Sequence, residues 1–123
     1  MQNRQGSGSE ESAAIFKTLA HPIRIAILDL LRHGEECVCH IEAILGKRQA
    51  YISQQLAILR AAQIIIDRRD GMNIFYRVIR PEIYALLDAA RALSPLPTAT
   101  PPPMIRLESC PCPKCTPEVA VTD

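Results

Sequence analysis

The chain has 123 residues and a mass of 13.6 kDa, with 48% hydrophobic residues, 22% charged residues and a net charge of +1. A chain of this length builds one hydrophobic core, and its apolar fraction excludes general disorder. It contains no apolar run long enough to span a bilayer, and the polar start from Met1 to Glu11 does not resemble a signal peptide. We therefore expect a cytoplasmic protein without a membrane segment.

The prolines mark where the folded part of the chain ends. Eight of the ten prolines follow Ser94, and proline interrupts both helices and strand pairing. The first residues are rich in Gly, Ser and Gln and show no hydrophobic periodicity. We expect a flexible N-terminus over residues 1–9, a folded domain over residues 10–94 and a Pro- and Cys-rich tail over residues 95–123.

Hydrophobic spacing predicts four helices in the first half of the domain. Two helices meet at His21-Pro22, and the second ends at Gly34, because proline suits a first helical turn and glycine suits the position just past a helix end. A short helix before Gly46 is followed by a longer one over about 49–62. Their apolar faces contain Ile15, Phe16, Leu19, Ile23, Ile27, Leu30, Leu31, Ile41, Ile44, Leu45, Ile52, Leu56 and Leu59.

The second half predicts a hairpin and one more helix. The β-branched run 64–66 and the segment 74–78 read as strands around a charged, Gly-containing turn over 67–73. Pro81 then opens a last helix with an apolar stripe made by Ile83, Leu86, Leu87, Ala90 and Leu93. The fold class is mainly α with a β-hairpin, in the order of a winged helix-turn-helix.

The distribution of charge favours a nucleic-acid partner. Seven basic and two acidic residues lie between Lys47 and Arg80, a local net charge of +5, and phosphate neutralisation requires only one basic face. On the 49–62 helix, side chains able to bond base edges or phosphates lie opposite the apolar residues. The alternative is a polar face that only solvates a buried helix. We expect DNA contacts from Gln49, Tyr51, Ser53, Gln54 and Gln55, with Arg48, Arg68 and Arg69 on the DNA backbone or in the minor groove.

Three segments resemble the ArsR/SmtB metal-responsive repressors: Cys37-Val38-Cys39, the run Tyr51-Ile52-Ser53-Gln54-Gln55-Leu56-Ala57-Ile58-Leu59-Arg60, and Asp67-Arg68-Arg69-Asp70-Gly71. The likeness covers about residues 11–93. It implies a homodimer that pairs through the first and last helices, binds a palindromic double-stranded operator and leaves it when an inducer binds. The stripe over 83–93 also favours a partner chain, although packing within the chain would satisfy it equally well.

Five cysteines form two groups: Cys37 and Cys39 in the domain, and Cys110, Cys112 and Cys115 in the tail. An odd number in a reducing compartment argues against a disulfide framework. Three thiolates can hold arsenic(III) or antimony(III), whereas zinc usually takes four ligands. In the resembling family, Cys-Val-Cys at this place is the arsenic(III) motif of one branch and part of the cadmium/lead site of another. We expect all five thiols to serve a soft metal or metalloid.

The chain departs from each branch of that family. Position 42 is Glu, so a third thiolate must come from the tail, either in a shared site or in a separate one. Residues 1–36 contain no Cys, and the last helix contains no His, which disfavours the usual cadmium/lead and zinc sites. His40 could add a nitrogen ligand for zinc or cadmium, but a partly exposed surface role is expected for it.

The spacing of Cys37 and Cys39 suggests a switch. Residues two apart on a regular helix point about 200° away from each other. Binding one ion would therefore deform the start of the third helix and tilt the 49–62 helix, which we expect to be the recognition helix. A sensor that uses the same thiols for redox or reactive-sulfur chemistry is the main alternative. A metal carrier that binds no operator is a further one. An enzyme is not expected, because the chain has no phosphate loop, nucleophile motif or carboxylate pair in an evident cleft.

Overall fold

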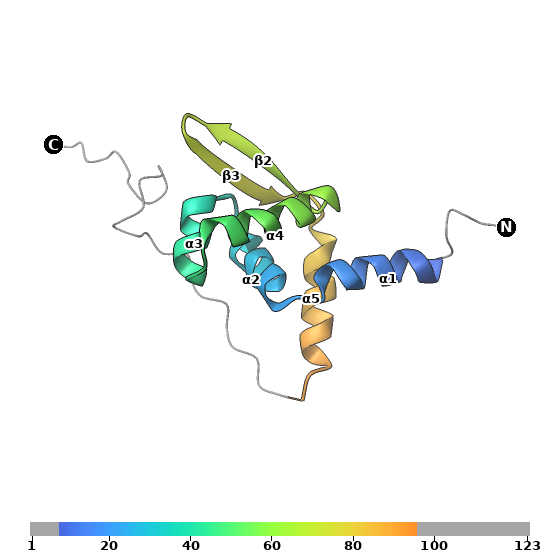
Figure 1. Cartoon of the computed structure of the whole chain (residues 1–123). Helices are drawn as coiled ribbons and strands as arrows, with labels where there is room; N and C mark the ends of the chain where they lie inside the picture. The colour runs from blue at the N-terminus through green and yellow to red at the C-terminus, as the bar shows by residue number, and fades with distance from the viewer. Residues whose placement is uncertain (1–7, 96–123) are drawn as a thin grey trace.

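The structure, a computed structural model, describes residues 8–95 (Figure 1). The helices are α1 (Gly8–Leu19), α2 (Pro22–Leu30), the 3₁₀-helix η1 (Leu31–His33), α3 (Val38–Leu45), α4 (Gln49–Ala61) and α5 (Glu82–Ala92). The strands are β1 (Glu36–Cys37), β2 (Ile65–Asp70) and β3 (Asn73–Val78). The mainly helical fold with a β-hairpin is confirmed. None of the helices within residues 8–95 is long and apolar enough to cross a membrane.

Proline and glycine residues mark the boundaries of several elements, as their backbone preferences predict. Pro22 begins α2 after an extended His21, and Gly46 ends α3 at φ +65° in the left-handed region. Gly71, at φ +64°, allows the turn between β2 and β3. Helix α1 begins at Gly8, two residues before the expected start of the domain, because Glu10 and Glu11 in its first turn complement the helix dipole.

The hydrophobic core packs beneath α3 and α4, the two helices of the helix-turn-helix, and holds them in place. It combines side chains of α2, α3, α4 and β2, and close packing of this kind leaves little freedom for one helix to move alone. Its fully buried aliphatic members are Ile27, Leu28, Ile41, Ile52, Leu56, Leu59 and Ile65. The three apolar residues predicted to bury the 49–62 helix are therefore confirmed as core residues.

The sheet has three strands and not the two that were predicted. Its order is β1-β3-β2 with both pairings antiparallel. Cys37 of β1 lies opposite Phe75 of β3, and Phe75 lies opposite Arg68 of β2. The strands of the hairpin also run further towards the tip than expected, so that only Gly71 and Met72 separate them. The segment before α3 is thus attached to the wing.

Helix α5 is anchored to α2 and η1 by polar contacts. The Tyr84 hydroxyl donates to the Leu28 carbonyl at 2.6 Å, and burial raises the pKa of Tyr84, which keeps this donor protonated. Arg32 binds both carboxylate oxygens of Asp88 at 2.9 and 3.3 Å and stacks on the Tyr84 ring. Arg91 pairs with Asp29. These contacts fix the direction in which α5 leaves the domain.

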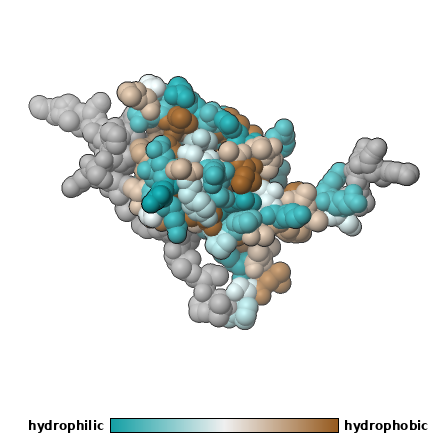
Figure 2. All heavy atoms as spheres, in the orientation of Figure 1, coloured by the Kyte–Doolittle hydropathy of each residue, from teal (hydrophilic) through white to brown (hydrophobic). Residues whose placement is uncertain are grey.

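The apolar stripe of α5 is divided between the chain's own core and the surface. Ile83 and Leu87 are buried in the core, whereas Ala90 and Leu93 are exposed. Helix α1 projects from the body in Figure 1 and buries only Leu19. Figure 2 shows apolar side chains at the surface around the place where α1 leaves the body. There an apolar groove of about 590 Å³ is lined by Ala14, Ile15, Thr18, Ala62, Ile64, Arg80, Glu82, Ile83 and Leu86.

Candidate nucleic-acid interface and thiol site

Helix α4 presents one polar face away from the core. Its buried side is made by Ile52, Leu56 and Leu59, at the helical spacing that places them on one stripe. The exposed members of the predicted contact set are Arg48, Gln49, Tyr51, Ser53 and Gln54. Arg48 is the N-cap residue of the helix and has an extended backbone. These side chains are accessible to a ligand that approaches α4.

Gln55 does not belong to that exposed face, and the prediction that it contacts DNA from there is wrong. Its side chain is buried, and its Oε1 accepts a hydrogen bond of 2.8 Å from Nε of Arg24. The reason is helical geometry, since Gln55 follows Ile52 by three residues and precedes Leu59 by four. The amide positions α4 and is not available to read bases.

Arg24 is a positioning residue that the sequence reasoning did not identify. It is buried on α2, and its Nη1 donates to the carbonyl of Thr18 at 2.9 Å. This carbonyl lies in the last turn of α1, where carbonyls have no partner within their own helix. Arg24 therefore joins α1, α2 and α4. The available signal was its spacing, because it shares one helix face with Ile27, Leu28 and Leu31.

The wing places its two arginines differently. Arg68 binds Glu35 in a bidentate pair, with Nε to Oε2 at 3.0 Å and Nη2 to Oε1 at 2.7 Å. Its guanidinium also lies over the Phe75 ring at 4.8 Å. The Glu35 carboxylate raises the pKa of Arg68, so the charge on Arg68 is permanent. Arg69 is exposed and forms no ion pair within residues 8–95.

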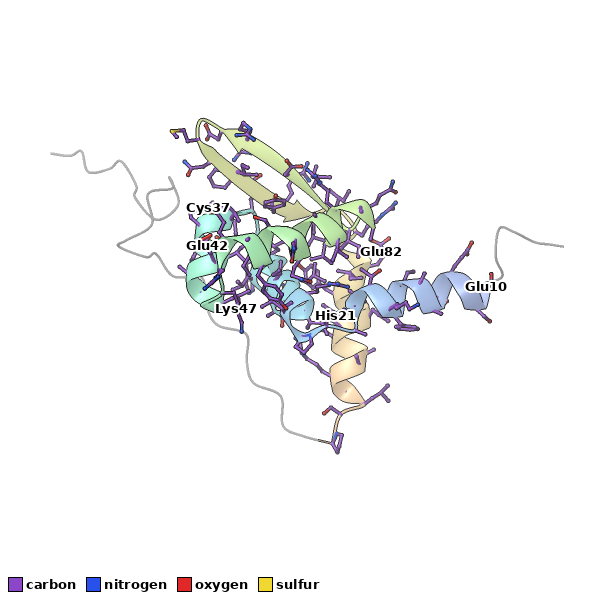
Figure 3. The ribbon with its side chains drawn as sticks, in the orientation of Figure 1. Glu10, His21, Cys37, Glu42, Lys47 and Glu82 are labelled. Carbon is purple, nitrogen blue, oxygen red and sulfur yellow. A yellow bond between two sulfur atoms is a disulfide. The ribbon has the colours of Figure 1, made fainter. Side chains whose placement is uncertain are left out.

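Cys37 and Cys39 lie at the junction of β1 and α3, and Cys37 is labelled on the left of Figure 3. The structure joins their sulfurs in a disulfide, with the two Cα atoms 5.4 Å apart. The sequence predicted such a pairing only for a redox sensor, and the expectation that both cysteines lie on a regular helix is wrong. So is the 200° divergence, because Cys37 is the extended N-cap residue before the helix and only Cys39 lies within its first turn. The two sulfurs meet without any deformation of α3.

Two more side chains complete this region. His40 is 4% exposed, and its Nδ1 lies 2.7 Å from Oε1 of the buried Glu36. The expectation of a partly exposed His40 is wrong, because the first turn of α3 packs beneath the sheet. The backbone N–H of His40 donates to the Cys37 sulfur at 3.3 Å, which caps the start of α3.

The described part of the chain holds only part of the predicted donor set. Within residues 8–95 there is no group of three or more His, Cys, Asp or Glu side chains that could hold a metal ion. Cys110, Cys112 and Cys115 lie outside the described residues. The pair Cys37 and Cys39 is the part of the predicted site that the structure brings together.

Comparisons with known proteins agree with this arrangement. The family model described as bacterial regulatory protein, arsR family, matches residues 21–67. A biofilm growth-associated repressor from Agrobacterium fabrum is 42% identical over 83 residues, which cover 68% of this chain and 71% of the relative. The chain belongs to the ArsR family. The predicted family resemblance is thereby confirmed, and this ArsR-family protein is a transcriptional regulator.

Two further proteins are similar to this chain. The arsenic resistance transcriptional regulator ArsR1 from Pseudomonas putida is 42% identical over 76 residues, covering 61% of this chain and 59% of the relative. A homodimeric winged helix-turn-helix DNA-binding domain from Mycobacterium bovis, a possible ArsR-family regulator, superposes with a TM-score of 0.65 at 27% identity. That match covers 75% of this chain and 88% of the other. The winged helix-turn-helix architecture of the ArsR-family protein is confirmed.

Gln54 and Gln55 provide a test of the positions assigned to α4. Gln55→Ala removes the acceptor of a buried arginine and should lower the free energy of unfolding by about 1–3 kcal/mol. Gln54→Ala removes an exposed side chain and should change it by less than about 0.5 kcal/mol. Urea unfolding followed by circular dichroism measures both, and equal stabilities for the two variants would contradict the buried position of Gln55.

Proposed function

We propose that the chain is a dimeric repressor that binds operator DNA and leaves it when arsenic(III) or antimony(III) binds cysteine thiolates. The observation that carries this proposal is the meeting of the Cys37 and Cys39 sulfurs at the β1–α3 junction. Once this disulfide is reduced, the two thiolates lie close together and are a preformed part of a soft-ion site. Because the junction adjoins both the helix-turn-helix and the wing, chemistry at the sulfurs lies next to the DNA-binding elements.

The DNA contacts assigned to the chain come from α4 and the wing. The exposed set Arg48, Gln49, Tyr51, Ser53 and Gln54 supplies hydrogen-bonding side chains for a groove. Arg68 and Arg69 supply positive charge for phosphates or the minor groove. Gln55 is removed from this set and supports α4 through Arg24.

The partner in the dimer is a second copy of the chain. The groove between α1 and α5, together with the exposed Ile15, Phe16 and Leu93, offers an apolar surface for it. A two-fold pairing of this surface covers the same residues on both copies. The homodimeric relative from M. bovis supports this assignment.

The inducer site needs a third thiolate beyond Cys37 and Cys39. We assign it to Cys110, Cys112 or Cys115, because Cys110 lies seventeen positions after Leu93 and a Pro-rich linker spans about 3 Å per residue when extended. A separate site among the three tail cysteines is the other arrangement. The arsenic-resistance relative from P. putida supports arsenic, and cadmium, lead and zinc are the alternative inducers.

A second candidate is a redox or reactive-sulfur sensor, and the disulfide between Cys37 and Cys39 favours it. In that reaction two thiols and one hydrogen peroxide give one disulfide and two waters, so that the sulfurs are oxidised and the peroxide is reduced. The DNA contacts are the same as for the metalloid sensor. The inducer is what separates the two functions.

The deciding experiment is a fluorescence-anisotropy titration of reduced protein on its own upstream promoter DNA. Arsenite, antimonite, cadmium, lead, zinc and peroxide are added separately to the complex. Selective release by arsenite or antimonite is the expected result, and release by peroxide alone would move the thiols to the redox class. Absence of promoter binding would overturn the repressor proposal.

The Cys37→Ser variant tests the role of the thiol. Serine is a favoured N-cap residue, so α3 should keep its start and the variant should bind the operator as the wild type does. Release by arsenite should be lost because one of the two adjoining thiolates is gone. The same titration measures both effects, and release at the wild-type arsenite concentration would contradict the assignment of Cys37.

The double variant Arg68→Ala, Arg69→Ala tests the wing. Each lost phosphate contact lowers the salt slope of binding by about 0.9, so two wings that lose two contacts each should lower it by about three to four. Binding should weaken by a similar factor on operator and on unrelated DNA. Unchanged affinity and slope would refute the role of the wing.

A further inference from the structure

The thiol pair and the wing are connected across the sheet. Cys37 lies opposite Phe75 in the pairing of β1 with β3, and Phe75 lies opposite Arg68 in the pairing of β3 with β2. The Arg68 guanidinium rests over the Phe75 ring at 4.8 Å. Cys37, Phe75 and Arg68 are therefore neighbours on three adjacent strands, which connects the thiol pair to the wing.

A second contact ties Arg68 to the same segment. Glu35 stands two residues before Cys37 and uses both carboxylate oxygens to bind two N–H groups of Arg68, at 2.7 and 3.0 Å. Bidentate pairs of this kind are the strongest ion pairs at a surface. The Arg68 side chain is 51% exposed and that of Glu35 is 26% exposed, so the pair is open to a competing anion.

A DNA phosphate is such a competitor. The N–H groups that Arg68 gives to Glu35 are the ones that a guanidinium uses for bidentate binding of phosphate. Arg68 cannot hold both partners in this way. Any change that strengthens or weakens the hold of Glu35 therefore changes the charge that the wing offers to DNA.

The segment that carries Glu35 has little freedom to absorb a change at Cys37. Glu36 is the only residue between them, and its buried carboxylate lies against His40. Both residues of β1 pair with β3, and the Cys37 sulfur caps α3. In the structure the sulfurs are joined and Glu35 holds Arg68.

We propose that Glu35 and Arg68 form a clamp that closes when the Cys37 and Cys39 sulfurs are joined, which takes Arg68 away from DNA. Separation of the thiols opens the clamp and frees Arg68 for a phosphate. The inference rests on the proposed function, because it assumes that the wing binds DNA. It replaces the tilting of a deformed helix by the loss of one charged contact per wing.

The test compares Glu35→Gln with Glu42→Gln, a matched variant that removes the same charge from α3. Each is made in full-length protein that also carries Cys110→Ser, Cys112→Ser and Cys115→Ser, so that joining is confined to Cys37 and Cys39. Peroxide joins the two sulfurs and releases two waters. Promoter affinity is measured over a range of salt concentrations in each state.

The clamp predicts a specific pattern of affinities. The reference protein carries only the three tail Cys→Ser substitutions. Joining the sulfurs should lower the promoter affinity of the reference protein and of the Glu42→Gln control by about tenfold. It should lower their salt slope by about two, because each of the two wings loses one phosphate contact. Glu35→Gln should lose less than twofold and keep its slope. Equal losses in Glu35→Gln and the reference protein would overturn the clamp alone. A reference protein that does not respond to peroxide would overturn the clamp and redox sensing by this pair, whereas a reduced protein that does not bind the promoter would overturn the proposed repressor.

A second measurement does not depend on DNA. The Nε–H group of Arg68 can be followed by NMR in the free protein and assigned with Arg68→Lys. Its resonance should be shifted and slow to exchange with water when the sulfurs are joined, and should move to the position of a free arginine on reduction. In Glu35→Gln it should stay at the free position in both states. An identical resonance in the joined and reduced reference protein would overturn the clamp even if no promoter were bound.

Discussion

The structure depends on the pairing of the two-residue strand β1 with β3. This short ladder attaches the N-terminal end of α3 to the wing, so the helix-turn-helix and the hairpin form one unit. Besides this ladder, the hairpin contacts α3, α4 and η1. A two-stranded ribbon alone is only marginally stable in water, and a third strand with a core beneath it supplies the missing support. Cys37 lies on the strand that provides this support.

Buried polar contacts then fix the directions of the helices. Arg24 reaches the end of α1 and Gln55 on α4, and Glu36 lies against His40 below the sheet. A buried polar group that loses its partner costs about 1–3 kcal/mol, so these pairs disfavour alternative packings of the same apolar surfaces. The aliphatic core makes the fold stable, and the polar pairs select one arrangement of its helices.

The helices and the hairpin could be predicted because their signals are local. Gly46, Pro22 and the spacing of Ile52, Leu56 and Leu59 each determine structure within a few residues, and all of them behave as expected. β1 could not be predicted, since a two-residue strand is defined only by its distant partner Phe75. The burial of Gln55 could not be predicted either. Its polar side chain suggested exposure, but it accepts a hydrogen bond from the buried Arg24 on another helix. Errors at the thiol pair arose from one boundary, because Cys37 lies just before the helix and not within it.

The exposure of α1 has a consequence for how a dimer would form. This helix has twelve residues but buries only Leu19 against its own domain. Isolated helices of this length are marginal in water, so the helical state of α1 gains little from its own chain. In a dimer built on the α1–α5 surface, the order of α1 and the association of the two chains become one equilibrium. Protein concentration would then control the helical content of residues 8–19 as well as the number of free subunits.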